Sequence, residues 1–329
     1  MLTASAAVPA PVSVVIPAYN HAAYIVAAIE SVLAQTTPPR EVIVVDDGSP
    51  DDTAARVAPL AEAGRIRYVR QANAGMAAAR NAGARLATSE YLYFLDDDDL
   101  LFRDAVRPLV RELTEHREAA FAYGDMVVFD DRPPPCPGPH SGARGDPPRA
   151  VNPTEFLLFN QIGSPGQVLM RRQAFLDVGG FNPQIWGTDD WDLWLRLLRD
   201  HPARMVPRPV IAYRLHANNA SRNIARMYRS SLAVARHHLA EVPTERRPVL
   251  RRYSYARLRR YHAPRIARTL ADDLRRGAWR RAAAAVGAWG LAWASDGAAH
   301  LALKAHLLRR GRWRLPVDEP VFGIRALDT

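Results

Sequence analysis

The stretch EYLYFLDDDDLLF, residues 90–102, decides how the rest of this sequence is interpreted. An apolar run ends in four consecutive aspartates, Asp96 to Asp99. A single aspartate after a strand is usually a turn residue or a helix cap, and Asp99 suits that role. Four adjacent carboxylates repel one another, and a divalent cation with oxygen ligands relieves that repulsion. The stretch therefore predicts a strand that ends at a metal site.

Similar apolar runs occur earlier in the chain and predict a parallel sheet. VSVVIP (12–17), VIVVDDGS (42–49) and RIRYVR (65–70) are rich in β-branched residues. Such runs are typical of strands that are buried on both faces. Residues 22–35 have apolar side chains at helical spacing, and residues 75–87 are rich in alanine, so helices are expected there. The predicted order of strand and helix implies right-handed crossovers.

Polar residues follow each of these four predicted strands. They are Tyr19 and Asn20, Asp46 and Asp47, Asn73, and Asp96 to Asp99. In open α/β sheets, ligands bind beyond the carboxyl ends of the strands. We therefore expect these side chains to line one crevice.

The second half of the chain predicts fewer strands and more helix. Residues 121–130 predict a strand, residues 166–181 a strand and a helix closed by Gly179 or Gly180, and residues 189–200 an amphipathic helix. Residues 131–149 are dense in proline and glycine and predict a flexible loop, either a lid or a disordered insertion. From about Ile224 the sequence indicates helices rich in alanine and arginine.

Composition limits the classes of protein that fit. The chain has 329 residues, is 48% hydrophobic and contains one cysteine, Cys136, so an internal disulfide and a cysteine zinc site are excluded. The first eleven residues lack the features of a secretory signal. The apolar stretch 282–303 is interrupted by Asp296 and His300, so we expect no transmembrane helix. These features favour a cytoplasmic protein.

The formal net charge of +10 is unevenly distributed. Thirteen arginines and only two acids lie between Arg246 and Arg281. A solvated helical surface, attraction to anionic lipid headgroups and binding of nucleic acid are the alternatives. No nucleic-acid motif accompanies the charge, so no nucleic-acid partner is expected. Peripheral contact of the basic C-terminal helices with the inner face of the cell membrane is the functional hypothesis.

No phosphate-binding loop is present in the sequence. G-x-x-x-x-G-K-[ST] does not occur, and no G-x-G-x-x-G follows the first predicted strand. This argues against P-loop kinases and NAD enzymes. A phosphate bound by this chain would be held chiefly through the metal.

Seven motifs together resemble the glycosyltransferase family 2 pattern. They are VSVVIPAYN, VIVVDDGSPDDT, NAGMAAARNAGARLA, YLYFLDDDD, VLMRRQAFLDVGGFN, DDWDLWLRL and YRLHANNAS, which occur in this order over about residues 12–221. The resemblance implies inverting enzymes with the α/β GT-A fold, a Rossmann-like, mostly parallel sheet with flanking helices. It implies a GT-A domain over 1–223, with a nucleotide-sugar half at about 12–125 and an acceptor half at 151–221. A basic helical region, 224–329, lies outside it.

The resemblance also implies roles for single residues. Asp190 would be the catalytic base, and Asp98 with His216 would hold Mg²⁺ or Mn²⁺. Asp47 would accept a hydrogen bond from a uracil or thymine base, Asp97 would lie near the ribose, and Arg80 near the base or phosphates. The implied nucleotide-binding residues are Pro17, Tyr19, Asp47, Asn73, Arg80, Asp96 and Asp97. Asp189 stands where the family often has glutamate.

These observations predict a metal-dependent inverting glycosyltransferase. It would move a sugar from a nucleoside-diphosphate sugar, of the UDP or dTDP type, to a saccharide or lipid-linked acceptor in surface polysaccharide or glycolipid synthesis. Two alternatives stay open. A nucleotidyltransferase should have a glycine-rich, basic loop where this chain has PAYNHAAY. An inactive nucleotide-sugar or glycan-binding module would have no need of the acidic segment or the base, and the sequence has both.

Overall fold

The structure, a computed structural model, describes residues 9–130, 147–277 and 286–287. The chain divides into two compact units. The first consists of Met1–Val151, Ile162–Gln184 and Arg196–Ala217, and the second of Asn152–Gln161, Ile185–Leu195 and Asn218–Thr329. The domain boundary predicted at residue 223 stays a prediction. Residues 131–146 of the loop expected at 131–149, and most of the apolar stretch 282–303, lie outside the described residues. Arg149, at the end of the expected loop, already belongs to a strand.

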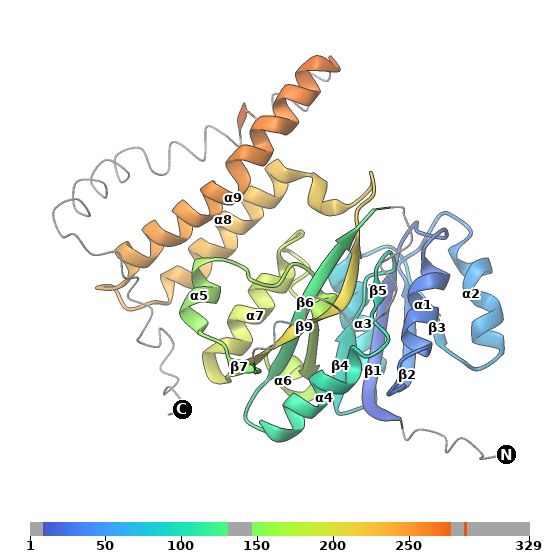
Figure 1. Cartoon of the computed structure of the whole chain (residues 1–329). Helices are drawn as coiled ribbons and strands as arrows, with labels where there is room; N and C mark the ends of the chain where they lie inside the picture. Colours follow the sequence, from blue (N-terminus) through green and yellow to red (C-terminus); the bar gives the residue numbers. More distant parts are fainter. Residues whose placement is uncertain (1–8, 131–146, 278–285, 288–329) are drawn as a thin grey trace. The chain divides into compact units, whose positions relative to one another are not determined.

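The first unit contains a nine-stranded sheet (Figure 1). The strand order is β3-β2-β1-β4-β8-β6-β9-β5, and β7 pairs with β9. The strands are β1 Ala10–Ala18, β2 Pro39–Asp46, β3 Arg67–Arg70, β4 Tyr91–Phe94, β5 Leu100–Leu101, β6 Phe121–Phe129, β7 Arg149–Ala150, β8 Val168–Arg171 and β9 Ala203–Arg214. The fold prediction of an α/β sheet with flanking helices is confirmed.

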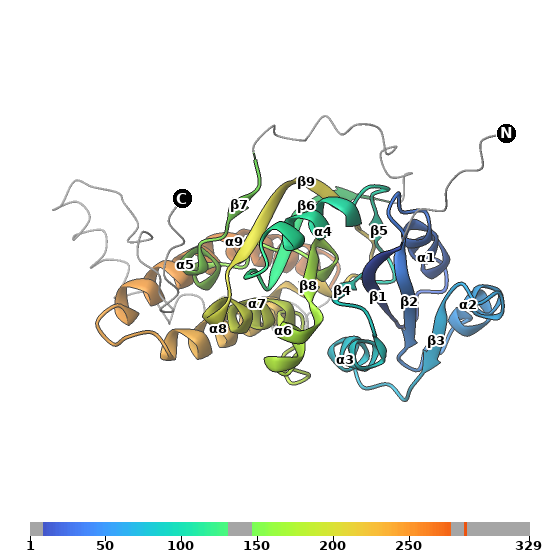
Figure 2. The ribbon, with the colours of Figure 1, turned by 90° about the horizontal axis from the view of Figure 1, so that it is seen from below.

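Strands β1 to β4 are parallel to one another, so their carboxyl ends meet at one edge. Side chains alternate along β1 because a strand has a period of two. Val14 and Ile16 belong to the core cluster that includes side chains of α1 (Ile25–Leu33) and α4 (Val106–Glu115). Figure 2 shows α3 (Met76–Leu86) on the opposite side of the sheet from α1. Helix α2 (Thr53–Glu62) also contributes Val57 to this core.

The other half of the sheet is mixed. Strand β8 runs antiparallel between β4 and β6, whereas β9 is parallel to β6. The sequence did not reveal β9, because Pro207 and Pro209 argue against a strand in the interior of a sheet. In the structure Pro209 pairs with Asp125, where the register between β6 and β9 shifts. The irregularity accommodates the prolines, and β9 then continues to Arg214.

Helix α6 (Arg172–Asp177) ends as the sequence predicted. The backbone N–H of Gly179 donates to Leu176 O, and that of Gly180 donates to Phe175 O. Both glycines have positive φ, 81° and 71°, a conformation that favours glycine. Phe181, the next residue, is buried.

The second unit is helical in its described residues. It contains α5 (Pro153–Leu158), the short η2 (Ala220–Arg222), α8 (Ile224–Ala240), α9 (Arg247–Arg275) and the first residues of α7 (Asp189–Asp200). Trp191 and Trp194 of α7 are buried and belong to the core. His238 Nε2 of α8 contacts Asp192 Oδ1 at 2.9 Å. None of the helices in the described part of the chain is long and apolar enough to cross a membrane.

Candidate active site

The carboxyl ends of β1 and β4 meet at Asp97. This aspartate follows β4 and is 1% exposed. Its Oδ2 accepts a hydrogen bond from the backbone N–H of Tyr19, at 3.0 Å. Its Oδ1 lies 2.7 Å from Nδ1 of His21. Asp97 therefore ties the loop after β1 to the acidic segment after β4.

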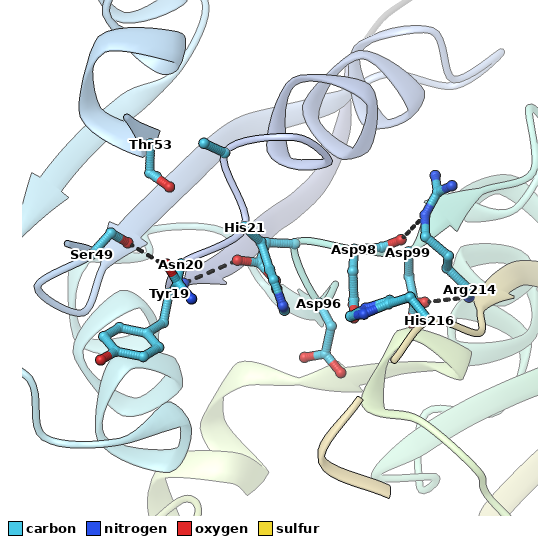
Figure 3. Close-up of polar contacts among 12 residues, drawn as sticks. Tyr19, Asn20, His21, Ser49, Thr53, Asp96, Asp98, Asp99, Arg214 and His216 are labelled. Carbon is cyan, nitrogen blue, oxygen red and sulfur yellow. Dashed lines mark hydrogen bonds and ion pairs between the residues drawn. The ribbon is translucent and has the colours of Figure 1, made fainter. Parts of the chain in front are cut away.

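Asp98 contacts a histidine that follows β9. Oδ2 of Asp98 lies 2.8 Å from Nε2 of His216, and both side chains are largely buried (Figure 3). The two residues are 118 positions apart in the sequence. Strand β9 pairs with β5, which follows the acidic segment directly, and this pairing brings His216 to the acidic segment.

Arg214 joins the same two segments through its backbone and its side chain. Its backbone N–H donates to Asp99 Oδ1 at 2.9 Å, and its Nε donates to the backbone oxygen of Asp98 at 2.9 Å (Figure 3). The guanidinium also lies over the rings of Tyr24 and Phe129, at 4.8 and 4.5 Å from their centroids. Asp99 therefore accepts a hydrogen bond from a neighbouring strand, which is a different role from the helix cap considered above.

Burial and mutual repulsion perturb this cluster. Burial raises the pKa of Asp97 to about 6, although His21 acts in the opposite direction. Burial and the charge of Asp96 raise the pKa of Asp98. Burial and the charges of Asp98 and Asp96 hold the pKa of Asp99 well above its usual range. Burial lowers the pKa of His21, but the hydrogen bond and charge of Asp97 outweigh it, so its pKa is raised.

The donor set fits a divalent cation. Within the described residues, one ligand atom each from His21, Asp98 and His216 lie within 4.8 Å of one another. A bound cation favours the charged form of nearby carboxylates and would relieve the repulsion just described. Asp98 and His216 were predicted from the sequence as metal residues, and the structure brings them together.

The residues predicted to bind the nucleotide lie at the same edge of the sheet. Asp47 follows β2 and is 1% exposed. Its Oδ1 accepts from Gln71 Nε2 and the backbone N–H of Ala74, and its Oδ2 accepts from the N–H of Gly75. Asp47 thus holds the segment that carries exposed Asn73. Its predicted contact with a base stays a prediction.

Three further predicted residues differ in accessibility. Arg80 Nη2 of α3 donates to Asp96 Oδ1 at 2.7 Å, and its guanidinium lies 5.2 Å from the ring centroid of Phe181. Pro17 is buried in β1, opposite Val45 of β2, whereas Tyr19 is 40% exposed. Of these three residues, Tyr19 therefore has the side chain that is most accessible to a ligand.

Asp190, the predicted base, belongs to the second unit and lies in the first turn of α7. It is 8% exposed. Its Oδ1 accepts from the backbone N–H of Trp191 at 2.6 Å, and Asn160 Nδ2 lies 3.5 Å from its Oδ2. Trp186 is partly buried, and the guanidinium of Arg226 lies over its ring, 4.1 Å from the ring centroid.

Sequence reasoning missed His21, Tyr24 and Arg214. A lone histidine after a strand, or a lone arginine at the end of one, has no periodicity that distinguishes it from other polar residues. The signal that was available is position, because His21 directly follows Tyr19 and Asn20 at the end of β1, and Arg214 lies two residues before His216.

Comparison with known proteins identifies the class. The model of the family described as glycosyl transferase family 2 matches residues 13–179, just over half of the chain. A second model, glycosyltransferase like family 2, matches residues 153–244. The sheet with an acidic cluster at the carboxyl ends of its parallel strands is thus the framework of a glycosyltransferase domain. The chain belongs to glycosyl transferase family 2.

Relatives and solved structures agree with this family. An uncharacterized glycosyltransferase of Rickettsia felis is 29% identical over 226 residues, which cover 65% of this chain and 36% of that protein. The chondroitin synthase of Escherichia coli is 31% identical over 211 residues, 64% of this chain and 30% of that protein. The match thus spans about a third of the length of each of these relatives.

The structural comparison supports the fold. S. aureus TarS 1-349 has a TM-score of 0.56 and 18% identity, and the match covers 74% of this chain and 70% of that one. TarS 1-349 in complex with UDP-GlcNAc has a TM-score of 0.56 and 16% identity, over 92% and 93% of the two chains.

Proposed function

We propose that this chain is a metal-dependent inverting glycosyltransferase. It transfers a sugar from a nucleoside-diphosphate sugar to an acceptor hydroxyl. The proposal rests mainly on the 2.8 Å contact between Asp98 and His216, which lies beside His21. This contact lies at the carboxyl ends of the parallel strands, where ligands bind in α/β folds. Family membership supplies the reaction class.

The nucleotide half of the reaction is assigned to the first unit. Asp98 and His216 would hold Mg²⁺ or Mn²⁺, which as a Lewis acid stabilises the negative charge that develops on the departing diphosphate. Tyr19 is exposed beside this edge and is available to stack on a base. Arg80 and Asp96 form an ion pair at 2.7 Å. We propose that this pair lies beside the phosphates and the sugar of the donor.

The donor is proposed to carry a uridine or thymidine nucleotide. S. aureus TarS, which shares the fold, has been crystallised with UDP and with UDP-GlcNAc. The proposed nucleotide-binding residues remain Pro17, Tyr19, Asp47, Asn73, Arg80, Asp96 and Asp97. Screening nucleoside-diphosphate sugars for thermal stabilisation and for hydrolysis in the presence of Mn²⁺ tests this proposal. Equal responses to UDP-, dTDP-, GDP- and CDP-sugars would contradict it.

Asp190 is proposed to act as the general base. An acceptor hydroxyl is a weak nucleophile, and a carboxylate within about 3 Å takes its proton as attack proceeds. Direct attack on the anomeric carbon then inverts its configuration. Trp191 and Asn160 orient the Asp190 carboxylate from within the second unit.

Replacement of Asp190 tests this role. Asp190→Asn should lower kcat for transfer by about 10²- to 10⁴-fold, the range of general base catalysis, and leave nucleotide affinity nearly unchanged. Asp200→Asn is the matched control, because Asp200 is an exposed residue at the end of the same helix. Unchanged transfer by Asp190→Asn would remove it as the base. If transfer were absent from the unmodified chain as well, while nucleotide sugars still bound, the inactive binding module would be favoured.

The acceptor is proposed to be a growing surface polysaccharide or a lipid-linked saccharide. In this setting α9 is proposed to contact anionic membrane lipids, because Arg251, Arg257, Arg260, Arg265 and Arg268 are exposed on it. Each such residue near an anionic surface adds about 1 kcal/mol. Co-sedimentation with vesicles containing anionic lipid should decrease as salt is raised. Equal binding to neutral vesicles, or none to anionic vesicles at low salt, would contradict the proposal.

A further inference from the structure

We propose that His21 is a third protein ligand of the cation, and that the site therefore prefers a first-row transition-metal ion such as Mn²⁺ to Mg²⁺. The inference rests on the proposed function in one respect, the assignment of Asp98 and His216 as ligands. It adds a residue from the loop after β1 and a reason for metal selectivity.

The spacing of the three residues suits one cation. Ligand atoms bound about 2.1 Å from an octahedral ion lie about 3 Å apart when adjacent and about 4 Å apart when opposite. Oδ2 of Asp98 and Nε2 of His216 are separated by 2.8 Å, which is close to the adjacent spacing. All three residues place a ligand atom within 4.8 Å of the other two.

The orientation of His21 is fixed by Asp97. Nδ1 of His21 lies 2.7 Å from Asp97 Oδ1, and the other oxygen of this buried carboxylate is held by the backbone N–H of Tyr19. When the Nδ1–H group of His21 donates a hydrogen bond to Asp97, Nε2 carries the lone pair and can bind a metal. Metal-bound histidines almost always donate their other ring N–H to a carboxylate, a backbone carbonyl or a water, which sets the tautomer and the direction of the ring.

The rings of the two histidines are arranged compatibly. Their centroids are 5.2 Å apart, and their planes are inclined by 89°. In Figure 3 His21 and His216 come from different segments and lie on either side of the space beside Asp96 and Asp98. Two imidazoles and one carboxylate therefore surround one position, and the nucleotide phosphates can supply the remaining oxygen ligands.

The donor set determines which metal is preferred. Mg²⁺ favours oxygen ligands and retains several waters. Imidazole nitrogen binds transition-metal ions more strongly, with affinities that rise from Mn²⁺ along the first-row series. A site with two imidazoles should consequently discriminate against Mg²⁺, whereas one carboxylate and one imidazole would discriminate less.

A pair of variants separates ligation from the ion pair with Asp97. His21→Asn places an amide N–H near the position of Nδ1, so a hydrogen bond to Asp97 is retained while Nε2 is lost. His201→Ala is the matched control, because His201 is a partly exposed histidine of the same unit, just after α7. Circular dichroism and the thermal midpoint confirm that both variants are folded.

The experiment measures Mn²⁺ binding to the full chain by electron paramagnetic resonance, with and without UDP and with increasing Mg²⁺. Electron spin echo modulation reports nitrogen couplings to the bound Mn²⁺. We expect two imidazole couplings in the unmodified chain and in His201→Ala, and one in His21→Asn. We also expect Mn²⁺ affinity to fall by at least about 10-fold in His21→Asn, because losing even an outer-shell partner of a metal ligand typically costs about 10- to 100-fold.

The outcomes distinguish this inference from the proposed function. Unchanged couplings and Mn²⁺ affinity in His21→Asn would overturn the role of His21 and leave the proposed function in place. Displacement of Mn²⁺ by an equal concentration of Mg²⁺ would overturn the selectivity. Failure of the unmodified chain to bind Mn²⁺ with or without UDP would overturn both.

Discussion

Arg214 connects the strand that carries His216 to the segment that carries Asp98 and Asp99. Its side chain donates to the backbone of Asp98 and contacts the rings of Tyr24 and Phe129, while its backbone donates to Asp99. The residue is thus a positioning residue for the proposed metal ligands. The positive charge of the Arg214 guanidinium also balances part of the negative charge of the four neighbouring aspartates.

We expect Arg214→Ala to weaken the site and the fold together. Loss of the cation–π contacts and of the hydrogen bond to Asp98 should lower the free energy of unfolding by about 1–3 kcal/mol. Mn²⁺ affinity should also decrease, because Asp98 and His216 would no longer be held at their present separation. Urea unfolding and Mn²⁺ titration measure the two effects.

Arg208→Ala is a suitable control, because the Arg208 side chain is 46% exposed and lies 3.8 Å from Asp104, an ion pair of the surface type. It should change the free energy of unfolding by less than about 0.5 kcal/mol. Unchanged Mn²⁺ affinity in Arg214→Ala would contradict the positioning role.

At the scale of elements, the packing of α3 on the sheet depends on a glycine. Gly83 faces β1 and β2, and a Cβ atom at this position would overlap the side chain of Val15 and approach Val45 Cγ2 to 3.2 Å. Arg80 lies on the same helix and contacts Asp96. The close approach of α3 to the sheet therefore also determines where Arg80 meets the acidic segment.

Gly83→Ala should consequently be destabilising, even though alanine favours a helix. Overpacking in a core costs about 1–3 kcal/mol, and the gain in helix propensity offsets only about 1 kcal/mol. Arg85→Ala, at an exposed position on the same helix, should change the free energy of unfolding by less than about 0.5 kcal/mol. A more stable Gly83→Ala variant in urea unfolding would show that the helix can move away from the sheet without cost.

The sequence predicted some of these elements better than others, for physical reasons. Strands β1, β2 and β4 are apolar on both faces and end in polar residues, so their type and parallel direction could be predicted. Strand β9 could not, because its prolines are tolerated only through a register shift. The contact between Asp98 and His216 followed from family resemblance, whereas His21 required the three-dimensional structure, since its partner Asp97 is 76 residues away.

At the scale of the whole molecule, the chain divides into a sheet-containing unit and a helical unit. The helical unit contains a buried histidine that affects stability. Burial and the charge of Arg265 lower the pKa of His262 to about 4. Its Nδ1 has no hydrogen-bond partner in the described structure, and its ring packs against Tyr228. The neutral form is therefore the one that the folded state favours.

This histidine should make the chain less stable in acid. The ordinary pKa of about 6.5 applies to the unfolded state, so between pH 6.5 and 4 the unfolded chain binds a proton that the folded chain does not. The contribution of His262 to the free energy of unfolding should fall as the pH is lowered over this range, by about 3 kcal/mol at most. His262→Phe should reduce the dependence relative to the unmodified chain, and His237→Phe, at an exposed position on α8, should not. Identical pH profiles for His262→Phe and the unmodified chain would contradict the assignment.

The central claim is that Asp98 and His216 hold a cation that carries the diphosphate of a nucleotide. The most direct measurement is a crystal structure of the full chain with UDP and Mn²⁺, with the metal located by anomalous scattering. We predict one strong peak within about 2.4 Å of a carboxylate oxygen of Asp98 and of a ring nitrogen of His216, in contact with the UDP phosphates. Ordered UDP with its phosphates and Mn²⁺ away from these two residues would contradict the account.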